Sequence, residues 1–286
     1  MQARLVETIE GLEVLEKIAD PLAGAIAKVL PAGPVKDVLS GTALGHPVHP
    51  VLTDVAIGSW VNSVFLDLVG GEASQDASDA LLALGIAAAL PTAVTGLSDW
   101  ADTWGKARRL GVVHAGLNVA ALLCFGGSLA ARRGGSRGVG RLLSLAGAGI
   151  MTAGAYLGGH LSFRKGVGVD ETTFDEGPAE WTRAMALADL PEATPTTARV
   201  NGVTLFLYRR GDQIRAIGNR CSHRGAPLNE GDCDGDVVTC PWHGSRFRIA
   251  DGAIVRGPAI AKQPAYEVRV TEGAVEVRRS PAELHA

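Results

Sequence analysis

Two short motifs in the last third of the chain each combine a cysteine with a histidine. Cys221 and His223 form the first pair, and Cys240 and His243 form the second. Thiolates are soft anionic ligands and imidazoles are neutral nitrogen ligands, so these four side chains together could hold a metal ion or a metal cluster. Since each motif supplies one ligand of each kind, both loops must meet at the same metal site.

Two kinds of metal centre use two cysteines and two histidines. A structural zinc site usually groups cysteine with cysteine and histidine with histidine, and a helix often carries the histidines. A Rieske [2Fe–2S] centre binds one iron through two cysteines and the other through two histidines, and the imidazoles raise its reduction potential. Each motif here joins a cysteine to a histidine, and this arrangement favours the iron–sulfur centre over zinc.

The sequence around the motifs indicates a small antiparallel β domain. From Trp181 onward, short runs of β-branched and aromatic residues alternate with turn dipeptides such as Asn201-Gly202. We expect an all-β domain over residues 180–280, joined to the preceding part by a polar linker over residues 164–179. The expected strands are residues 203–208, 213–217, 237–239, 266–271 and 274–278.

The two ligand loops closely resemble those of the Rieske ferredoxin family. They read Cys-Ser-His-Arg-Gly-Ala-Pro-Leu from Cys221 and Cys-Pro-Trp-His-Gly-Ser-Arg-Phe from Cys240. The resemblance implies a β-sandwich-like domain with one [2Fe–2S] cluster at its tip, where the histidine ligands reach solvent. It also places Trp242, Ser245 and Pro258 around the cluster, with Pro258 in a third loop that covers it.

The loops also depart from the Rieske proteins of quinol-oxidising cytochrome complexes. Those proteins carry two further cysteines that bridge the loops, and here Ala226 and Trp242 occupy these positions. Their potential-raising serine is matched by Ser245, whereas the tyrosine that follows it is replaced by Phe247. Fewer hydrogen bonds to the sulfurs lower the reduction potential, so we expect a value toward the lower end of the Rieske range.

Four long apolar segments precede the β domain. Each has about the length that a helix needs to cross a bilayer. A soluble helical domain would have to bury all of them, so we predict a four-helix transmembrane bundle over residues 41–163 and an integral protein of a bacterial-type inner membrane. The motif Gly45-His46-Pro47-Val48-His49-Pro50 resembles an uncharacterised family of four-helix membrane domains. The apolar segments are residues 51–69, 80–97, 112–131 and 142–161.

The ends of this bundle give a prediction of its orientation. Four crossings place both ends on one side of the membrane, and lysine and arginine are more numerous near the helix ends on that side. The positive-inside rule therefore predicts a cytoplasmic β domain. Residues 1–40 form an amphipathic helical segment that either packs on the bundle or lies on the membrane surface.

The same count of crossings predicts that four histidines lie on one side of the membrane. His46 and His49 precede or begin the first crossing, His114 begins the third, and His160 ends the fourth. Ionisable side chains at membrane depth often mark functional sites. They could ligate a b-type haem, line a quinone pocket or bind another metal, and they could equally cap helices and contact lipid headgroups.

These features predict a membrane-anchored electron-transfer protein of two domains, all-α and then all-β. It would carry single electrons between a reductase or the quinone pool and an oxygenase or another membrane redox partner. A haem- or quinone-dependent oxidoreductase with a second redox centre in the bundle is one alternative, and a redox sensor is another. We do not expect a self-contained Rieske oxygenase, because one histidine follows His243 and a catalytic iron needs two with a carboxylate. The net charge of −3 argues against nucleic acid as a partner.

Overall fold

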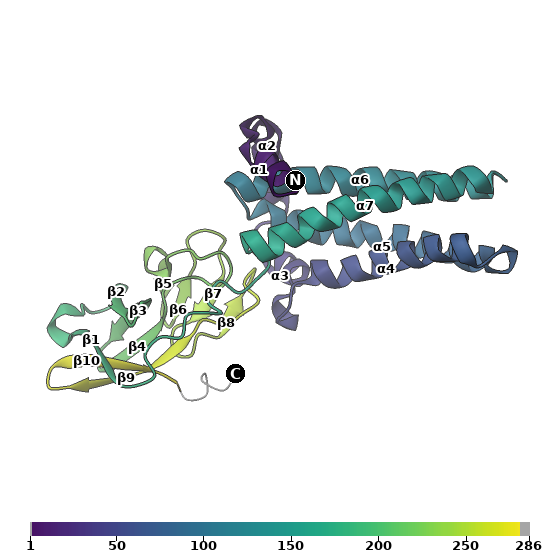
Figure 1. Ribbon diagram of the computed structural model, residues 1–286. Coiled ribbons are helices and arrows are strands. Elements are labelled where there is room, and N and C mark those ends of the chain that lie inside the picture. The colour runs from purple at the N-terminus through teal and green to yellow at the C-terminus, as the bar shows by residue number, and fades with distance from the viewer. Residues whose placement is uncertain (1, 281–286) are drawn as a thin grey trace. The chain divides into compact units, whose positions relative to one another are not determined.

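The computed structural model describes residues 2–280. They form two compact units (Figure 1). The first unit is helical and contains the residues up to 30 together with residues 47–167. The second contains residues 31–46 and the residues from 168 onward, and most of it is β structure.

Four long helices make up most of the helical unit and lie side by side in Figure 1. All four are long and apolar enough to cross a membrane. α4 packs along α5 and α6 packs along α7, with further contacts between α5 and α6 and between α4 and α7. This arrangement confirms the predicted four-helix domain. The helices are α4 (Val48–Val69), α5 (Gln75–Ala101), α6 (Gly105–Arg133) and α7 (Arg137–Lys165).

The bundle buries only a narrow interior and leaves large apolar side chains on its outer surface. At its centre the rings of Trp60 and Phe125 stack with centroids 4.3 Å apart. Leu90 and Leu123 are among the many aliphatic side chains that are more than half exposed. Contact between lipid tails and such an apolar surface has no free-energy cost, whereas contact with water is unfavourable.

Two shorter helices, α1 (Gln2–Gly11) and α2 (Glu16–Val29), pack against one end of the bundle. Ion pairs join them to α6 and α7. Glu16 pairs with Arg109 at 2.8 Å, and Asp20 pairs with Arg108 at 2.9 Å. The predicted helical character is therefore present in these two helices, and Glu16 and Asp20 contact the bundle.

The β unit contains two antiparallel sheets. The six-stranded sheet has the order β1-β10-β9-β4-β3-β2, and the four-stranded sheet has the order β5-β6-β7-β8. The helical part followed by this all-β part confirms the predicted fold class. The strands are β1 (Thr182–Ala186), β2 (Thr196–Val200), β3 (Val203–Arg210), β4 (Gln213–Gly218), β5 (Asp232–Asp234), β6 (Val237–Thr239), β7 (Arg246–Arg248), β8 (Ile254–Arg256), β9 (Ala265–Thr271) and β10 (Ala274–Arg279).

The segment 31–46 belongs to the β unit, whereas the sequence analysis divided it between the helical segment of residues 1–40 and the bundle of residues 41–163. It contains the short helix α3 (Pro34–Ser40). The Asp37 carboxylate accepts a hydrogen bond from the backbone of Gly257, and burial raises the pKa of this carboxyl group. A methyl group on Gly257 would collide with Thr42, so the segment 31–46 and the loop that contains Pro258 pack closely.

Candidate metal centre

The first ligand loop follows β4 and is closed by two backbone hydrogen bonds. The N–H of Cys221 donates to the carbonyl of Ala226 at 2.8 Å, and the N–H of Gly225 donates back to the carbonyl of Cys221 at 2.8 Å. Gly225 has φ +75°, a left-handed conformation that glycine adopts without strain. The turn fixes the direction in which the Cys221 side chain leaves the backbone.

The second ligand loop connects β6 with β7 and repeats this geometry. The N–H of Cys240 donates to the carbonyl of Ser245 at 2.7 Å, and the N–H of Gly244 donates to the carbonyl of Cys240 at 3.2 Å. Gly244 has φ +74°. Two loops of the same hydrogen-bonding pattern therefore present one cysteine and one histidine each, as the paired motifs suggested.

The four ligand side chains come together with the thiols inside and the imidazoles nearer the surface. Cys221 is 0% exposed and Cys240 is 3% exposed, and both belong to the apolar core of this unit. The rings of His223 and His243 meet edge to face, with centroids 5.1 Å apart. All four cysteines lie within the described residues, and none of them forms a disulfide there.

The electrostatics of the four side chains fit a cationic metal group. Burial and the charge of His243 lower the pKa of His223 well below its ordinary value, so its imidazole is neutral and keeps a lone pair. The hydrogen bond with Cys240 and burial raise the pKa of Cys221, because two adjacent buried thiolates repel each other. Iron between the two sulfurs would remove this repulsion, so the donor set fits a cluster with one cysteine-bound and one histidine-bound iron.

The predicted surroundings of the cluster lie next to these ligands. Ser245 is fully buried, and its Oγ accepts a hydrogen bond from the N–H of Ala259 at 3.0 Å. Pro258, beside Ala259, is buried as well. Trp242 is 47% exposed, and its ring centroid lies 6.4 Å from that of His243. The buried serine and the exposed tryptophan therefore mark two different sides of the site.

Replacing Ser245 with alanine is expected to lower the reduction potential of the cluster. The Oγ of Ser245 already accepts a hydrogen bond from Ala259, so its own proton is available for the cluster sulfur. A hydrogen bond to a charged group contributes about 1.5–3 kcal/mol, which corresponds to about 60–130 mV for a one-electron couple. Potentiometric titration followed by electron paramagnetic resonance (EPR) measures the shift.

Ser222 offers the matched control. It lies in the other ligand loop, but its hydroxyl donates to the carbonyl of Ala261 at 2.6 Å and cannot also donate to sulfur. The Ser222→Ala variant should keep the potential of the original chain. An equal shift in both variants would mean that packing, and not a hydrogen bond to sulfur, causes the change.

The structure gives the four predicted membrane histidines different surroundings. His46 is exposed and belongs to the β unit, whereas the other three belong to the helical unit. The Nε2 atom of His160 faces the carboxylate of Glu10 in α1 at 3.5 Å, and Lys165 pairs with the same carboxylate at 2.6 Å. Only His49 and His114 share one environment, in which a backbone carbonyl contacts the Nδ1 atom.

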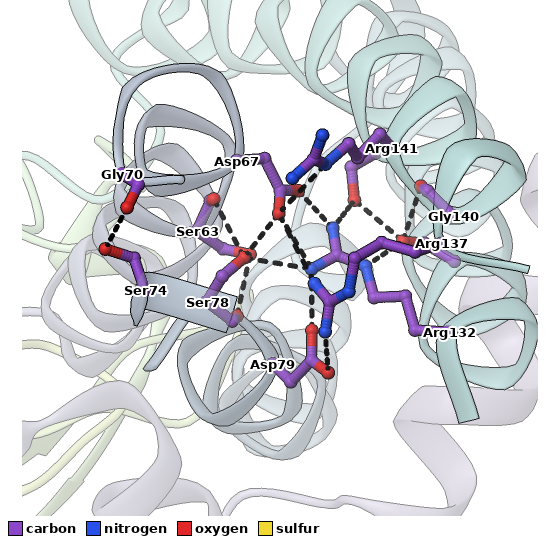
Figure 2. Close-up of polar contacts among 12 residues, drawn as sticks. Ser63, Asp67, Gly70, Ser74, Ser78, Asp79, Arg132, Arg137, Gly140 and Arg141 are labelled. Carbon is purple, nitrogen blue, oxygen red and sulfur yellow. Dashed lines mark hydrogen bonds and ion pairs between the residues drawn. The ribbon is translucent and has the colours of Figure 1, made fainter. Parts of the chain in front are cut away.

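Sequence reasoning missed a charged cluster at the other end of the bundle, which Figure 2 shows in close-up. The Arg132 side chain is completely buried and forms ion pairs with the carboxylates of Asp67 and Asp79. The guanidinium also donates to Ser144 at 3.0 Å and to Ser78 at 2.9 Å. In the sequence-based prediction of orientation, this arginine counted only as one of the positive charges near the helix ends. The signal that could have found it is the isolated Asp67 within the first apolar run.

Two protein families match separate parts of the chain. Residues 180–267 match the Rieske [2Fe-2S] domain, and residues 45–171 match the family described as predicted membrane protein (DUF2231). Both matches confirm the resemblances that the ligand loops and the Gly-His-Pro motif indicated.

Curated relatives cover the C-terminal part. Ferredoxin CarAc of Metapseudomonas resinovorans is 38% identical over 98 residues, which are 34% of this chain and 92% of the relative. The ferredoxin component of the naphthalene 1,2-dioxygenase system of Pseudomonas putida is 31% identical over 91 residues, covering 32% of this chain and 88% of the relative. The solved ferredoxin of carbazole 1,9a-dioxygenase from Nocardioides aromaticivorans IC177 is 31% identical, with a TM-score of 0.33, and covers 35% of this chain and 98% of that one.

Proposed function

Since this chain belongs to the Rieske ferredoxin family, with one [2Fe–2S] cluster as its cofactor, we propose that it is a membrane-anchored carrier of single electrons. The relative from Pseudomonas putida is described as the ferredoxin component of the naphthalene 1,2-dioxygenase system, and the one from Metapseudomonas resinovorans as a ferredoxin. By analogy, the donor is a reductase or the quinone pool, and the acceptor is an oxygenase or another redox protein at the same membrane. This proposal rests on one observation. Two loops together present two buried cysteines and two half-buried histidines as ligands.

The chain's own residues define where electrons would enter and leave. When bound, the cluster accepts or gives one electron at a time. The cysteine side is closed by the apolar core that includes Phe206 and Phe247. The histidine side lies beside Trp242, a large exposed aromatic ring of the kind that anchors protein interfaces. We therefore assign partner docking to the histidine side.

The helical domain supplies the membrane attachment in this proposal. The distribution of lysine and arginine near the helix ends favours a cytoplasmic cluster domain. Anchoring would confine the carrier to the plane of the membrane, where it meets membrane-bound partners more often than a soluble ferredoxin does. This distinguishes the chain from relatives that match it over the cluster domain alone.

Reduction of the full-length chain by defined donors tests this function. The oxidised chain in lipid nanodiscs is mixed in one arm with a flavin-dependent ferredoxin reductase and NADH, and in the other with a reduced quinone. The Rieske EPR signal should grow at least tenfold faster in one arm than in its donor-free blank. The proposal is wrong if neither donor reduces a cluster that dithionite does reduce.

The Trp242→Ala variant is expected to slow electron transfer to or from the partner about tenfold. Loss of an aromatic anchor typically costs a little over 1 kcal/mol of binding free energy, and 1.4 kcal/mol is a factor of ten. Val270 is equally exposed at 47% but lies on β9 in the six-stranded sheet, so Val270→Ala is the control. Stopped-flow rates at several partner concentrations measure the effect. Equal rates in both variants would exclude docking at Trp242.

A further inference from the structure

The transmembrane bundle contains two copies of one helical hairpin. The number of residues that separates His49 from His114 in the sequence also separates other pairs. In each pair one residue lies on α4, the other lies on α6, and both face the bundle interior. A second constant spacing relates α5 to α7. The equivalent pairs of α4 and α6 are His49 and His114, Ala56 and Ala121, Trp60 and Phe125, Ser63 and Ser128, and Asp67 and Arg132; those of α5 and α7 are Ser78 and Gly140, Gly85 and Gly147, Thr92 and Gly154, and Gly96 and Gly158.

The central contacts of the two hairpins are the same. The indole of Trp60 lies directly on Gly85, and a methyl group on that glycine would collide with the ring. Phe125 lies on Gly147 in the same way, with a methyl group there 3.2 Å from its Cε1 atom. The two rings then stack on each other across the middle of the bundle. Gly85 and Gly147 thus leave space for equivalent aromatic side chains.

The polar contacts of the hairpins are also equivalent. The hydroxyl of Ser63 donates to the carbonyl of Ser78 at 2.8 Å, and the hydroxyl of Ser128 donates to the carbonyl of Gly140 at 2.7 Å. α4 packs on α5 as α6 packs on α7, and the remaining contacts place α4 and α6 at opposite corners. An approximate two-fold axis therefore runs along the bundle between α4 and α6, as in membrane proteins built from parallel repeats.

His49 and His114 are held identically on the two sides of this axis. The Nδ1 atom of His49 lies 2.9 Å from the carbonyl oxygen of Thr92, and that of His114 lies 2.8 Å from the carbonyl oxygen of Gly154. Each ring covers the glycine one turn further along its partner helix. A methyl group on Gly96 would lie 2.6 Å from Cε1 of His49.

This contact decides which nitrogen of each imidazole can bind a ligand. A backbone carbonyl only accepts hydrogen bonds, so the Nδ1 atoms of His49 and His114 carry the proton. The Nε2 atoms therefore keep their lone pairs. Histidines that bind metals through one nitrogen usually donate the other N–H to a carbonyl or carboxylate in this way.

We propose that His49 and His114 together coordinate one transition-metal centre through their Nε2 atoms, either as a metal ion or as the iron of a porphyrin. His49 and His114 lie about three helical turns before Trp60 and Phe125 on the same faces of α4 and α6, and the rings of that pair meet across the two-fold axis. A metal at His114 would displace the amide group of Asn118, whose nitrogen lies 3.0 Å from the Nε2 atom. This centre is separate from the iron–sulfur cluster and adds a second metal site to the chain.

The metal content of the purified full-length chain tests the proposal directly. The chain is produced in cells supplied with iron salts and a haem precursor, extracted in mild detergent and analysed by elemental mass spectrometry and optical absorption. We expect about one transition metal per chain beyond the two cluster irons. A Soret band identifies a porphyrin, and extra metal without such a band identifies a bound ion.

Variants localise the site. The double variant His49→Ala/His114→Ala should lose the additional metal completely, whereas His160→Ala, whose imidazole faces Glu10, should retain it. Helical circular dichroism and an unchanged thermal midpoint of the detergent-solubilised chain show that the bundle of each variant is folded. The proposal is overturned if the original chain with a full cluster signal holds two irons and no other transition metal, even if a quinone is extracted from it. Retention of the extra metal in the double variant also overturns it.

Discussion

A Cys240→Ala variant of the full-length chain is expected to lose its [2Fe–2S] cluster and all electron-transfer activity. Cys240 supplies one of the two buried thiols, and its loop positions that thiol next to Cys221. Loss of a group that only supports a metal ligand already costs about 10–100-fold in affinity, so loss of the ligand itself should reduce cluster occupancy by more than about 100-fold. Iron content and the intensity of the reduced EPR signal measure the loss.

Cys233 provides the control for this substitution. Cys233 lies on β5, outside both ligand loops, and no histidine accompanies it in the sequence as in the paired motifs. The Cys233→Ala variant should keep its full signal. A Cys240→Ala chain with an undiminished cluster signal would contradict the ligand assignment. Loss of the signal in Cys233→Ala alone would contradict it as well.

The determinants of the predicted cluster site are local. Each loop carries its cysteine, its histidine and its turn glycine within a few consecutive residues, so the order of residues nearly determines the geometry. The placement of residues 31–46 could not be predicted in this way. It depends on contacts such as that between Asp37 and Gly257, which join segments far apart in the chain.

The membrane histidines show a second limit of sequence reasoning. The number of membrane crossings predicted that all four histidines lie on one side of the membrane. This number says nothing about the direction in which each side chain leaves its helix. His160 faces Glu10, whereas His114 faces the carbonyl of Gly154. Rotation about a helix axis is determined by packing, here by the glycines that receive the rings. The internal repeat became visible only when these contacts were known.

The Arg132→Ala variant is expected to lower the stability of the helical domain by about 3–5 kcal/mol, the cost of removing one side chain of a buried ion pair. Asp67 is almost fully buried and faces Arg132 in the cluster of Figure 2. The arginine joins α6 to Asp67 of α4 and to Asp79 of α5, so its loss loosens both hairpins at once. Arg137 and Arg141 also approach the carboxylate of Asp67, at 3.9 Å and 4.0 Å, but both are longer contacts from partly exposed side chains and compensate its charge only in part.

Thermal unfolding of the detergent-solubilised chain, followed by helical circular dichroism, measures this effect. A loss of 3–5 kcal/mol corresponds to a decrease in midpoint temperature on the order of 10 °C for a domain of this size. Arg133 is the next residue and is exposed, so Arg133→Ala should leave the midpoint nearly unchanged. The double variant Asp67→Leu/Arg132→Leu should recover part of the loss, because it removes both charges of the pair and leaves neither buried alone. If Arg132→Ala and Arg133→Ala had the same midpoint, the buried ion pairs would not hold the hairpins together. The intact EPR signal of the cluster domain in every variant would show that the measured change belongs to the bundle.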